Sequence, residues 1–282
     1  MKKYIKYYFI LIAIFLLSLV SCNKSSGSAD LVVSFYALNE LTTNLTKDTN
    51  ITVDTLIKGT AEPHEFEPSP SDVSKLYSAK TIIFNGLGLE EFSSALDNSI
   101  KNKIIYATDS MENIIEGDPH AFVSPKRLTK MLTYIKDNLV NTFKDEETII
   151  NKNYEAYLEE LNELDTLYKE AISSQVKPIV VSHEAFNYLK EDYNLNYYAV
   201  SGISEEEPTA KDISRIINLI KDNEIKVVYG SFFESDKTLS QIANETNSSL
   251  EYLYTLEMMD SSNVSLVDAI KYNAKVLVKN AK

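Results

Sequence analysis

The chain has only three histidines, and each lies just after a predicted strand or at the start of a predicted helix. They are His64 and His120, which both follow a proline, and His183. Proline restrains the backbone and with it the direction of the next imidazole. Imidazole is a good ligand for zinc, copper, iron or nickel. Because a histidine-poor chain places every histidine at such a junction, the pattern predicts one shared metal site rather than three unrelated side chains.

Other common chemistries have no motif in this sequence. It contains no His-Glu-x-x-His pair, Gly-x-Ser-x-Gly elbow, Gly-x-Gly-x-x-Gly loop or Walker A loop. The only cysteine is Cys22, so a cysteine nucleophile and a cysteine-based zinc site are not expected. The formal net charge of −13 also argues against a nucleic-acid partner, because proteins that bind nucleic acids usually carry a basic excess.

The histidines need a scaffold, and apolar runs mark two sets of strands along the chain. The strands are expected at 31–35, 51–57, 81–84 and 103–106, and at 178–181, 196–200, 226–229 and 250–254. Helical stretches between them include 38–45, 71–78, 186–191, 210–222 and 239–246. Helix starts are marked by Ser69-Pro70, by Ser124-Pro125 and by a capping box from Thr209 to Asp212. This alternation predicts an α/β fold of two lobes, each with a mostly parallel four-stranded sheet.

A single long helix is predicted between the two sets of strands. Residues 145–174 contain no proline or glycine, and apolar side chains recur at four-three spacing from Ile150 to Ala171. About thirty residues at ~1.5 Å each make a rod of roughly 45 Å. We expect this helix to pack along both lobes and to hold them more rigidly than a loop hinge. The alternative, one closed α/β barrel, is disfavoured because barrel helices are usually shorter and more even.

The N-terminus is predicted to be an export signal rather than part of the fold. A lysine-rich start precedes an apolar run over residues 7–20, which is too short for a stable spanning helix. The sequence Leu19-Val-Ser-Cys22 resembles a bacterial lipobox, so Cys22 is the predicted lipidation site, and its acyl chains would anchor the protein to a membrane. The polar residues that follow Cys22 suit a flexible tether.

These features divide the chain into five predicted segments. They are a signal peptide (1–21), a tether (22–30), an N-terminal α/β lobe (31–144), a linking helix (145–174) and a C-terminal α/β lobe (175–282). Hydrophobic residues make up 44% of the chain and charged residues 24%, as in globular proteins, so both lobes are expected to fold.

Several segments resemble the solute-binding proteins of zinc and manganese ABC transporters, a group that includes metal-binding adhesin lipoproteins. They are Gly59–Asp72, Asp118-Pro-His-Ala-Phe-Val-Ser-Pro125, Val181-Ser-His-Glu-Ala-Phe186, Asn85-Gly-Leu-Gly-Leu-Glu90 and Phe232-Phe-Glu-Ser235. The resemblance covers nearly all of residues 31–282. It implies two α/β lobes joined by one long helix, with a metal buried between them, which agrees with the elements expected above.

The resemblance implies that His64 and His120 are metal ligands from the first lobe and His183 is a ligand from the second. Manganese-type members commonly have a glutamate in place of His183, so this chain resembles the zinc-type members. Many members have an aspartate near the end of the last strand. Here Glu257 is the best match for it, Asp260 is the fallback, and a water could also complete the site. Three imidazoles and one carboxylate suit tetrahedral zinc, whereas manganese, the alternative cargo, prefers more oxygen ligands.

Acids beside the motifs are expected to orient the imidazoles or to face solvent. Glu62, Glu65, Glu67 and Asp118 flank the histidines, and of these Glu65 and Asp118 are the preferred orienting residues. The resemblance adds Glu234 in the same role. Because imidazoles must be deprotonated to bind a metal, we expect the metal affinity to fall as the pH drops through about 6.

The sequence thus predicts a binding protein and no enzyme. It would be an exported, lipid-anchored monomer on the outer face of a bacterial membrane, periplasmic or at the cell surface. The resemblance implies that it would capture zinc between its lobes and deliver the ion to an ABC permease driven by a separate ATPase. A manganese- or iron-specific member of the same family is the nearest alternative.

More distant alternatives are a haem or siderophore binder, a zinc-dependent hydrolase and an adhesin. The first would show Arg, Tyr or Trp partners in its cleft, and the chain has no Trp. A hydrolase would need an open metal position and a general base, for which Glu65 or Glu184 could serve. An adhesin role could coexist with metal binding.

Overall fold

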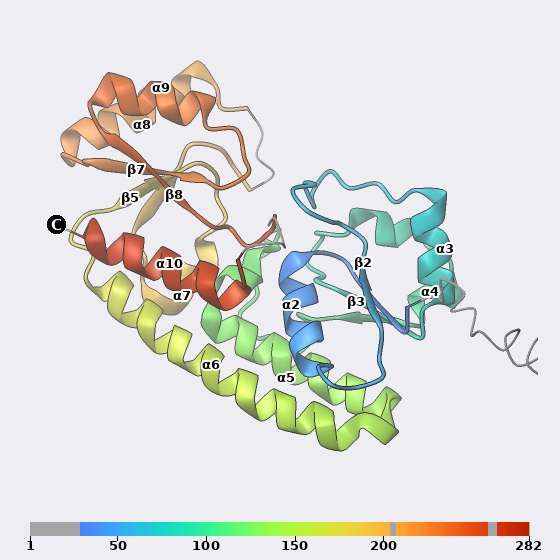
Figure 1. Ribbon diagram of the computed structural model, residues 1–282. Coiled ribbons are helices and arrows are strands. Elements are labelled where there is room, and N and C mark those ends of the chain that lie inside the picture. The colour runs from blue at the N-terminus through green and yellow to red at the C-terminus, as the bar shows by residue number, and fades with distance from the viewer. Residues whose placement is uncertain (1–28, 204–206, 259–263, 282) are drawn as a thin grey trace, which may run out of the picture.

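The computed structural model describes residues 29–203, 207–258 and 264–281, and these form two separate parallel sheets (Figure 1). The strand orders are β2-β1-β3-β4 and β6-β5-β7-β8. The strands are β1 (Leu31–Val33), β2 (Val53–Thr55), β3 (Thr81–Phe84), β4 (Ile104–Tyr106), β5 (Ile179–Val181), β6 (Tyr197–Ala199), β7 (Val227–Ser231) and β8 (Ser249–Leu253). The predicted α/β architecture is confirmed. The barrel alternative is wrong, because within the described residues the eight strands pair as two sheets of four.

Helices connect the strands in both lobes. They are α2 (Tyr36–Leu45), α3 (Pro70–Ser78), α4 (Asn98–Lys101), α5 (Pro125–Thr142), α6 (Glu147–Ser173), α7 (Asn187–Tyr193), α8 (Ala210–Asp222), α9 (Lys237–Thr246) and α10 (Leu266–Lys279). Short 3-10 turns lie at η1 (Glu91–Ala95), η2 (His120–Val123) and η3 (Lys144–Glu146). All helical stretches named from the sequence are present, with ends that differ by at most two residues.

The helix starts follow the cap signals, with one informative exception. Ser69 and Asp72 form the expected reciprocal capping box at the start of α3, and Thr209 and Asp212 do the same at α8. Ser124 precedes Pro125 at the start of α5 but makes no cap hydrogen bond with its side chain. Its hydroxyl instead donates to Asp192 Oδ2 on α7 at 2.8 Å, so it joins the two lobes.

The long helix α6 is confirmed and belongs to the cores of both lobes. It runs along one side of both sheets (Figure 1) and packs against α5, α10 and α2. Its predicted apolar stripe is buried, including Ile150, Leu161 and Ala171. Buried side chains of both sheets and of α5, α6 and α10 form one continuous core, while a second core lies between the C-terminal sheet and helices α8 and α9. The shared core explains how one helix can hold the lobes together without a loop hinge.

Helix α10, which the sequence analysis did not assign, ties the last part of the chain to the first lobe. Ser265 caps it by accepting a hydrogen bond from Asp268 N at 3.1 Å. Glu40 of α2 accepts a hydrogen bond from Leu266 N at 3.1 Å, and Tyr36 donates to Val264 O at 2.9 Å. The segment that follows β8 is therefore held at its far end by a helix of the other lobe.

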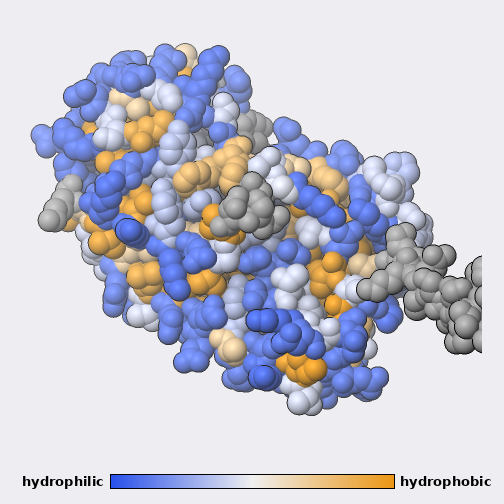
Figure 2. Space-filling view, in the orientation of Figure 1, coloured by the Kyte–Doolittle hydropathy of each residue, from blue (hydrophilic) through white to orange (hydrophobic). Residues whose placement is uncertain are grey.

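The outer surface is mostly hydrophilic on the face shown in Figure 2, with small separate apolar patches. No helix within the described residues has the length and apolar character to span a membrane. The predicted signal peptide and Cys22 lie outside the described residues.

Candidate metal centre

The four candidate ligands each follow the carboxyl end of a strand. His64 lies in the loop after β2, and His120 begins η2 after β4. His183 follows β5, and Glu257 follows β8. In a parallel sheet these ends lie along one edge, where α/β proteins usually bind ligands. The contacts between these residues show that the two sheets turn their carboxyl edges toward each other.

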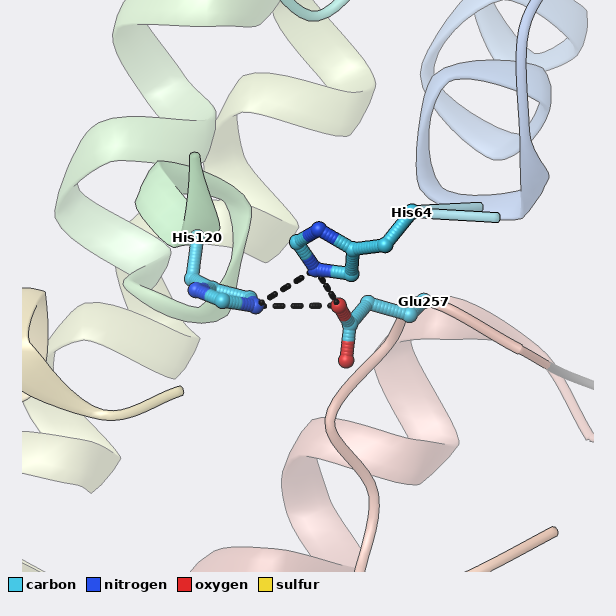
Figure 3. Close-up of side chains that lie close together, drawn as sticks. All are labelled: His64, His120 and Glu257. Carbon is cyan, nitrogen blue, oxygen red and sulfur yellow. Dashed lines mark hydrogen bonds and ion pairs between the residues drawn. The ribbon is translucent and has the colours of Figure 1, made fainter. Parts of the chain in front are cut away.

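His64, His120 and Glu257 converge on one point from three separate segments (Figure 3). The Nε2 atoms of the two histidines lie 3.3 Å apart. Glu257 Oε1 lies 3.1 Å from His64 Nε2 and 2.9 Å from His120 Nε2. Glu257 therefore brings a carboxylate of the C-terminal lobe between two imidazoles of the N-terminal lobe.

His183 completes the group from the second lobe. Its Nε2 lies 3.5 Å from Glu257 Oε2, the other oxygen of the same carboxylate. Its ring centroid is 5.6 Å from that of His120. Glu257 thus lies close to all three histidines, the set that the resemblance implied, with His64 and His120 at one carboxylate oxygen and His183 at the other.

The spacing of these atoms fits a tetrahedral ion. Ligands held at about 2.0–2.1 Å from zinc in a tetrahedron lie about 3.3 Å from one another. The three contacts among His64, His120 and Glu257 Oε1 measure 3.3, 3.1 and 2.9 Å, while His183 contacts the other oxygen, Oε2, at 3.5 Å. One ion could therefore replace the direct contacts among His64, His120 and Glu257, and His183 would have to move toward that ion to become its fourth ligand.

Burial and charge make this a tightly coupled site. Glu257 is 1% exposed, His120 0% and His183 2%. Burial alone would raise the pKa of Glu257, but the facing histidines hold that pKa well below its usual range. Burial would lower the pKa of His120, but Glu257 and Asp118 outweigh it and raise the pKa to about 9. The pKa of His183 is likewise raised, because hydrogen bonds to Glu234 and Glu257 outweigh burial.

The first two histidines share a local arrangement in which an acid two residues earlier accepts the histidine's backbone N–H. Asp118 Oδ1 accepts from His120 N at 2.9 Å and lies 2.7 Å from His120 Nδ1. Glu62 Oε1 accepts from His64 N at 3.0 Å. The sequence signal is the acid-Pro-His pattern present at both places. Asp118 thereby turns Nε2 of His120 toward the centre, as carboxylates commonly do for histidine ligands.

The acid expected beside His64 must be corrected. Glu65 is exposed, and within the described residues no hydrogen bond or ion pair joins it to a histidine. The flanking acid that contacts His64 is Glu62, and it does so through the backbone N–H rather than through the imidazole.

Glu234 lies where the resemblance implied, beside His183. Its Oε2 is 3.1 Å from His183 Nδ1, so Nε2 of that imidazole faces Glu257. Ser182 and Thr255 donate hydrogen bonds to the same carboxylate at 3.3 and 3.4 Å. Asp260, the fallback ligand, lies outside the described residues.

Two side chains that the sequence analysis did not place at the site touch the backbone immediately before His120. Asn85 donates to Pro119 O at 2.9 Å, and Tyr188 donates to Asp118 O at 3.0 Å. Asn85 lies in a segment recognised as part of the family resemblance, but neither residue type carries a spacing signal for this contact.

Comparison with known proteins identifies relatives over almost the whole folded chain. The family model described as "Zinc-uptake complex component A periplasmic" matches residues 31–280. The zinc-binding lipoprotein AdcA of Streptococcus pneumoniae is 30% identical over 294 residues, which cover 95% of this chain and 58% of AdcA. The high-affinity zinc uptake system protein ZnuA of Bacillus subtilis is 28% identical over 305 residues and is covered to 95%, as is this chain.

A solved structure shows the same fold. The Zn(II)-bound ZnuA-like domain of Streptococcus pneumoniae AdcA matches with a TM-score of 0.79 and 31% sequence identity, covering 90% of this chain and 99% of that domain. This chain spans little more than half the length of the full AdcA protein, 58%. The resemblance read from the histidine segments is thus confirmed, and the chain belongs to the family of zinc-uptake complex component A proteins.

Proposed function

We propose that this protein captures zinc outside the cytoplasmic membrane and delivers it to an ABC permease driven by a separate ATPase. The observation that carries this proposal is the convergence of His64, His120 and Glu257 at spacings that suit one tetrahedral ion, with His183 of the second lobe on the other oxygen of the same carboxylate. The zinc-binding and zinc-uptake names of its relatives support the same cargo.

Lipid anchoring belongs to this proposal. Cys22 would carry the acyl chains and residues 23–30 would form a tether. The folded lobes would then remain close to the permease in the membrane as a monomer. Acyl attachment is tested by labelling with a fatty-acid analogue in a bacterial host, with Cys22→Ala as the control that should lose the label.

The geometry favours a cargo-binding role over catalysis. A catalytic zinc site keeps one position open for water or substrate, whereas four protein ligands would close this one. Of the bases nominated for a hydrolase, Glu65 is exposed and makes no contact with the histidines within the described residues. We therefore infer that the bound ion is transported and performs no reaction.

A haem or siderophore would also fit poorly. The pocket that touches His183 and Glu234 has a volume of about 160 Å³ and is lined mainly by small and acidic side chains. Sites for small organic molecules usually measure about 300–1,000 Å³.

The test is the metal content of residues 23–282, purified without the lipid, followed by competitive titration with zinc and manganese. The proposal expects about one zinc per chain that manganese displaces poorly. His183→Glu should weaken zinc binding and reduce the difference between the zinc and manganese affinities. The control is Glu67→Gln, which changes an exposed acid of the His64 loop and should leave both affinities unchanged. Preferred binding of manganese would overturn the choice of metal, and a chain without stoichiometric metal would overturn the proposed function.

A further inference from the structure

The backbone immediately before His120 accepts hydrogen bonds from buried side chains of both lobes. Asn85, at the end of β3 in the first lobe, donates to Pro119 O at 2.9 Å. Tyr188, on α7 of the second lobe, donates to Asp118 O at 3.0 Å. Both side chains are fully buried, at 0% exposure. The peptide units that aim the His120 imidazole therefore cannot move without breaking a buried hydrogen bond to one lobe or the other.

The Tyr188 hydroxyl makes two contacts with this segment. Besides donating to Asp118 O, it accepts a hydrogen bond from Ile115 N at 3.1 Å. One phenol oxygen thus satisfies both a carbonyl and an amide of the loop that leads to His120. Phenylalanine at this position would keep the ring but leave both backbone groups without that partner, which is costly in a buried place.

Tyr188 is also close along the chain to His183, the histidine of its own lobe. Helix α7 begins at Asn187, four residues after His183, and Tyr188 is its second residue. The Tyr188 ring packs under the Arg127 guanidinium, 4.2 Å from the ring centroid. Arg127 is in turn held by Asp192 of the same helix, with Nε 2.8 Å from Oδ2. Arg127 thereby covers the Tyr188 ring, and α7 connects the loop of His183 with the loop of His120.

We propose that Tyr188 is a positioning residue that sets the separation of the His120 and His183 imidazoles before the metal arrives. This inference rests on the proposed zinc-binding function and concerns how that site gains affinity and selectivity. A site already arranged for its ligand loses less freedom on binding. The two imidazoles come from different lobes, so a fixed distance between them favours zinc, which is usually bound by four close ligands. Manganese prefers more ligands and more oxygen atoms, and it gains less from this arrangement.

The test compares two substitutions that each remove one phenol oxygen. Tyr188→Phe removes the hydroxyl between the lobes. Tyr197→Phe is the matched control, because the Tyr197 hydroxyl donates to Asn187 Oδ1 at 2.8 Å and so remains within the second lobe while touching the same helix. Both variants are made in residues 23–282, and zinc, manganese and cobalt(II) are titrated into each.

Tyr188→Phe should weaken zinc binding about tenfold, as expected for a residue that supports a metal ligand. Its manganese affinity should change less, and the visible spectrum of its cobalt(II) form should differ from wild type because the ligand geometry has changed. In the metal-free variant, amide hydrogen exchange should rise over residues 112–120, where the Ile115 amide has lost its acceptor. Tyr197→Phe should show none of these changes.

Three results would overturn the inference. One is an unchanged zinc affinity in Tyr188→Phe, and another is an equal loss in Tyr197→Phe. The third is weaker binding with an unaltered cobalt(II) spectrum and unaltered exchange over 112–120, which would make Tyr188 important for stability alone. Failure of the proposed function is read separately, from the zinc content of the wild-type chain.

Discussion

His120 and Glu257 are 137 residues apart in the chain, yet Nε2 of the histidine lies 2.9 Å from Oε1 of the glutamate. The pair joins the two lobes at the centre of the candidate site, and both side chains are buried. The raised pKa of His120 and the lowered pKa of Glu257 make it an ion pair in the metal-free chain. A metal ion that binds here must therefore displace the proton that His120 carries in the metal-free chain.

Glu257→Gln should weaken zinc binding by more than about 100-fold, because loss of a direct ligand costs more than loss of a supporting contact. The substitution keeps the side chain's size and removes its charge. Competition with a chromophoric chelator measures the effect. Glu65→Gln, an exposed acid next to His64, is the control and should bind zinc as wild type does. Tight zinc binding by Glu257→Gln would show that Asp260 or a water supplies the fourth ligand.

Zinc affinity should rise with pH between about 7 and 9. The pKa of His120 is raised to about 9, so in the metal-free chain this imidazole is protonated below that pH, and zinc must displace the proton. The competition begins well above the value near 6 expected from an unshifted histidine. Calorimetry at pH 7 in two buffers with different ionisation enthalpies should show release of about one proton or more. A binding enthalpy that is independent of the buffer would contradict this.

Asp118→Asn should lower zinc affinity about 10–100-fold, the range typical of residues that orient a histidine ligand. The loss of charge beside Nδ1 should also shift the pKa of His120 toward its ordinary value, moving the proton competition to lower pH. Titration by NMR of the metal-free protein reports the pKa, and metal competition reports the affinity. Asp109→Asn, an exposed acid in the same β4–η2 connection, is the matched control. Equal effects of the two variants would argue against an orienting role.

Arg127→Met should destabilise the metal-free protein by about 3–5 kcal/mol, because it leaves Asp192 buried without its main partner. The side chains of Arg127 and Asp192 are only 5% and 6% exposed. Lys126→Met is the control. Its ammonium also lies near Asp192, at 3.4 Å, but is 51% exposed, so its loss should cost less than about 1 kcal/mol. Denaturant unfolding of both variants measures the difference, and comparable losses would mean that burial does not govern this interaction.

Local sequence signals accounted for most of the scaffold. The periodicity of apolar residues located both sets of strands. It also located the long helix, because an apolar stripe at four-three spacing without proline or glycine is typical of an amphipathic helix. Helix α10 was not assigned, although Ser265 and Asp268 cap it. The expected strands were longer than those observed at β2, where hydrogen bonding to Val33 and Ser34 continues beyond Thr55 without regular strand geometry.

At the site, the histidines could be identified one by one because their positions after strands and prolines are local properties of the chain. The sequence could not show whether Glu62 or Glu65 contacts His64, because both residues flank it. Only the path of the loop decides which carboxylate accepts the hydrogen bond from the His64 backbone. Tyr188 carried no signal at all, because its contact with Asp118 joins residues 70 positions apart.

The sequence by itself determined which residue types are available for metal chemistry and the order of elements that carries them. The three histidines of a histidine-poor chain each follow a strand, and this pattern already indicates a shared metal site. Only the tertiary structure decided that Glu257 meets His120, that Glu62 rather than Glu65 supports His64, and that Tyr188 links the lobes. These contacts arise when two sheets pack against one shared helix, and the distances between their edges depend on that packing rather than on any local pattern.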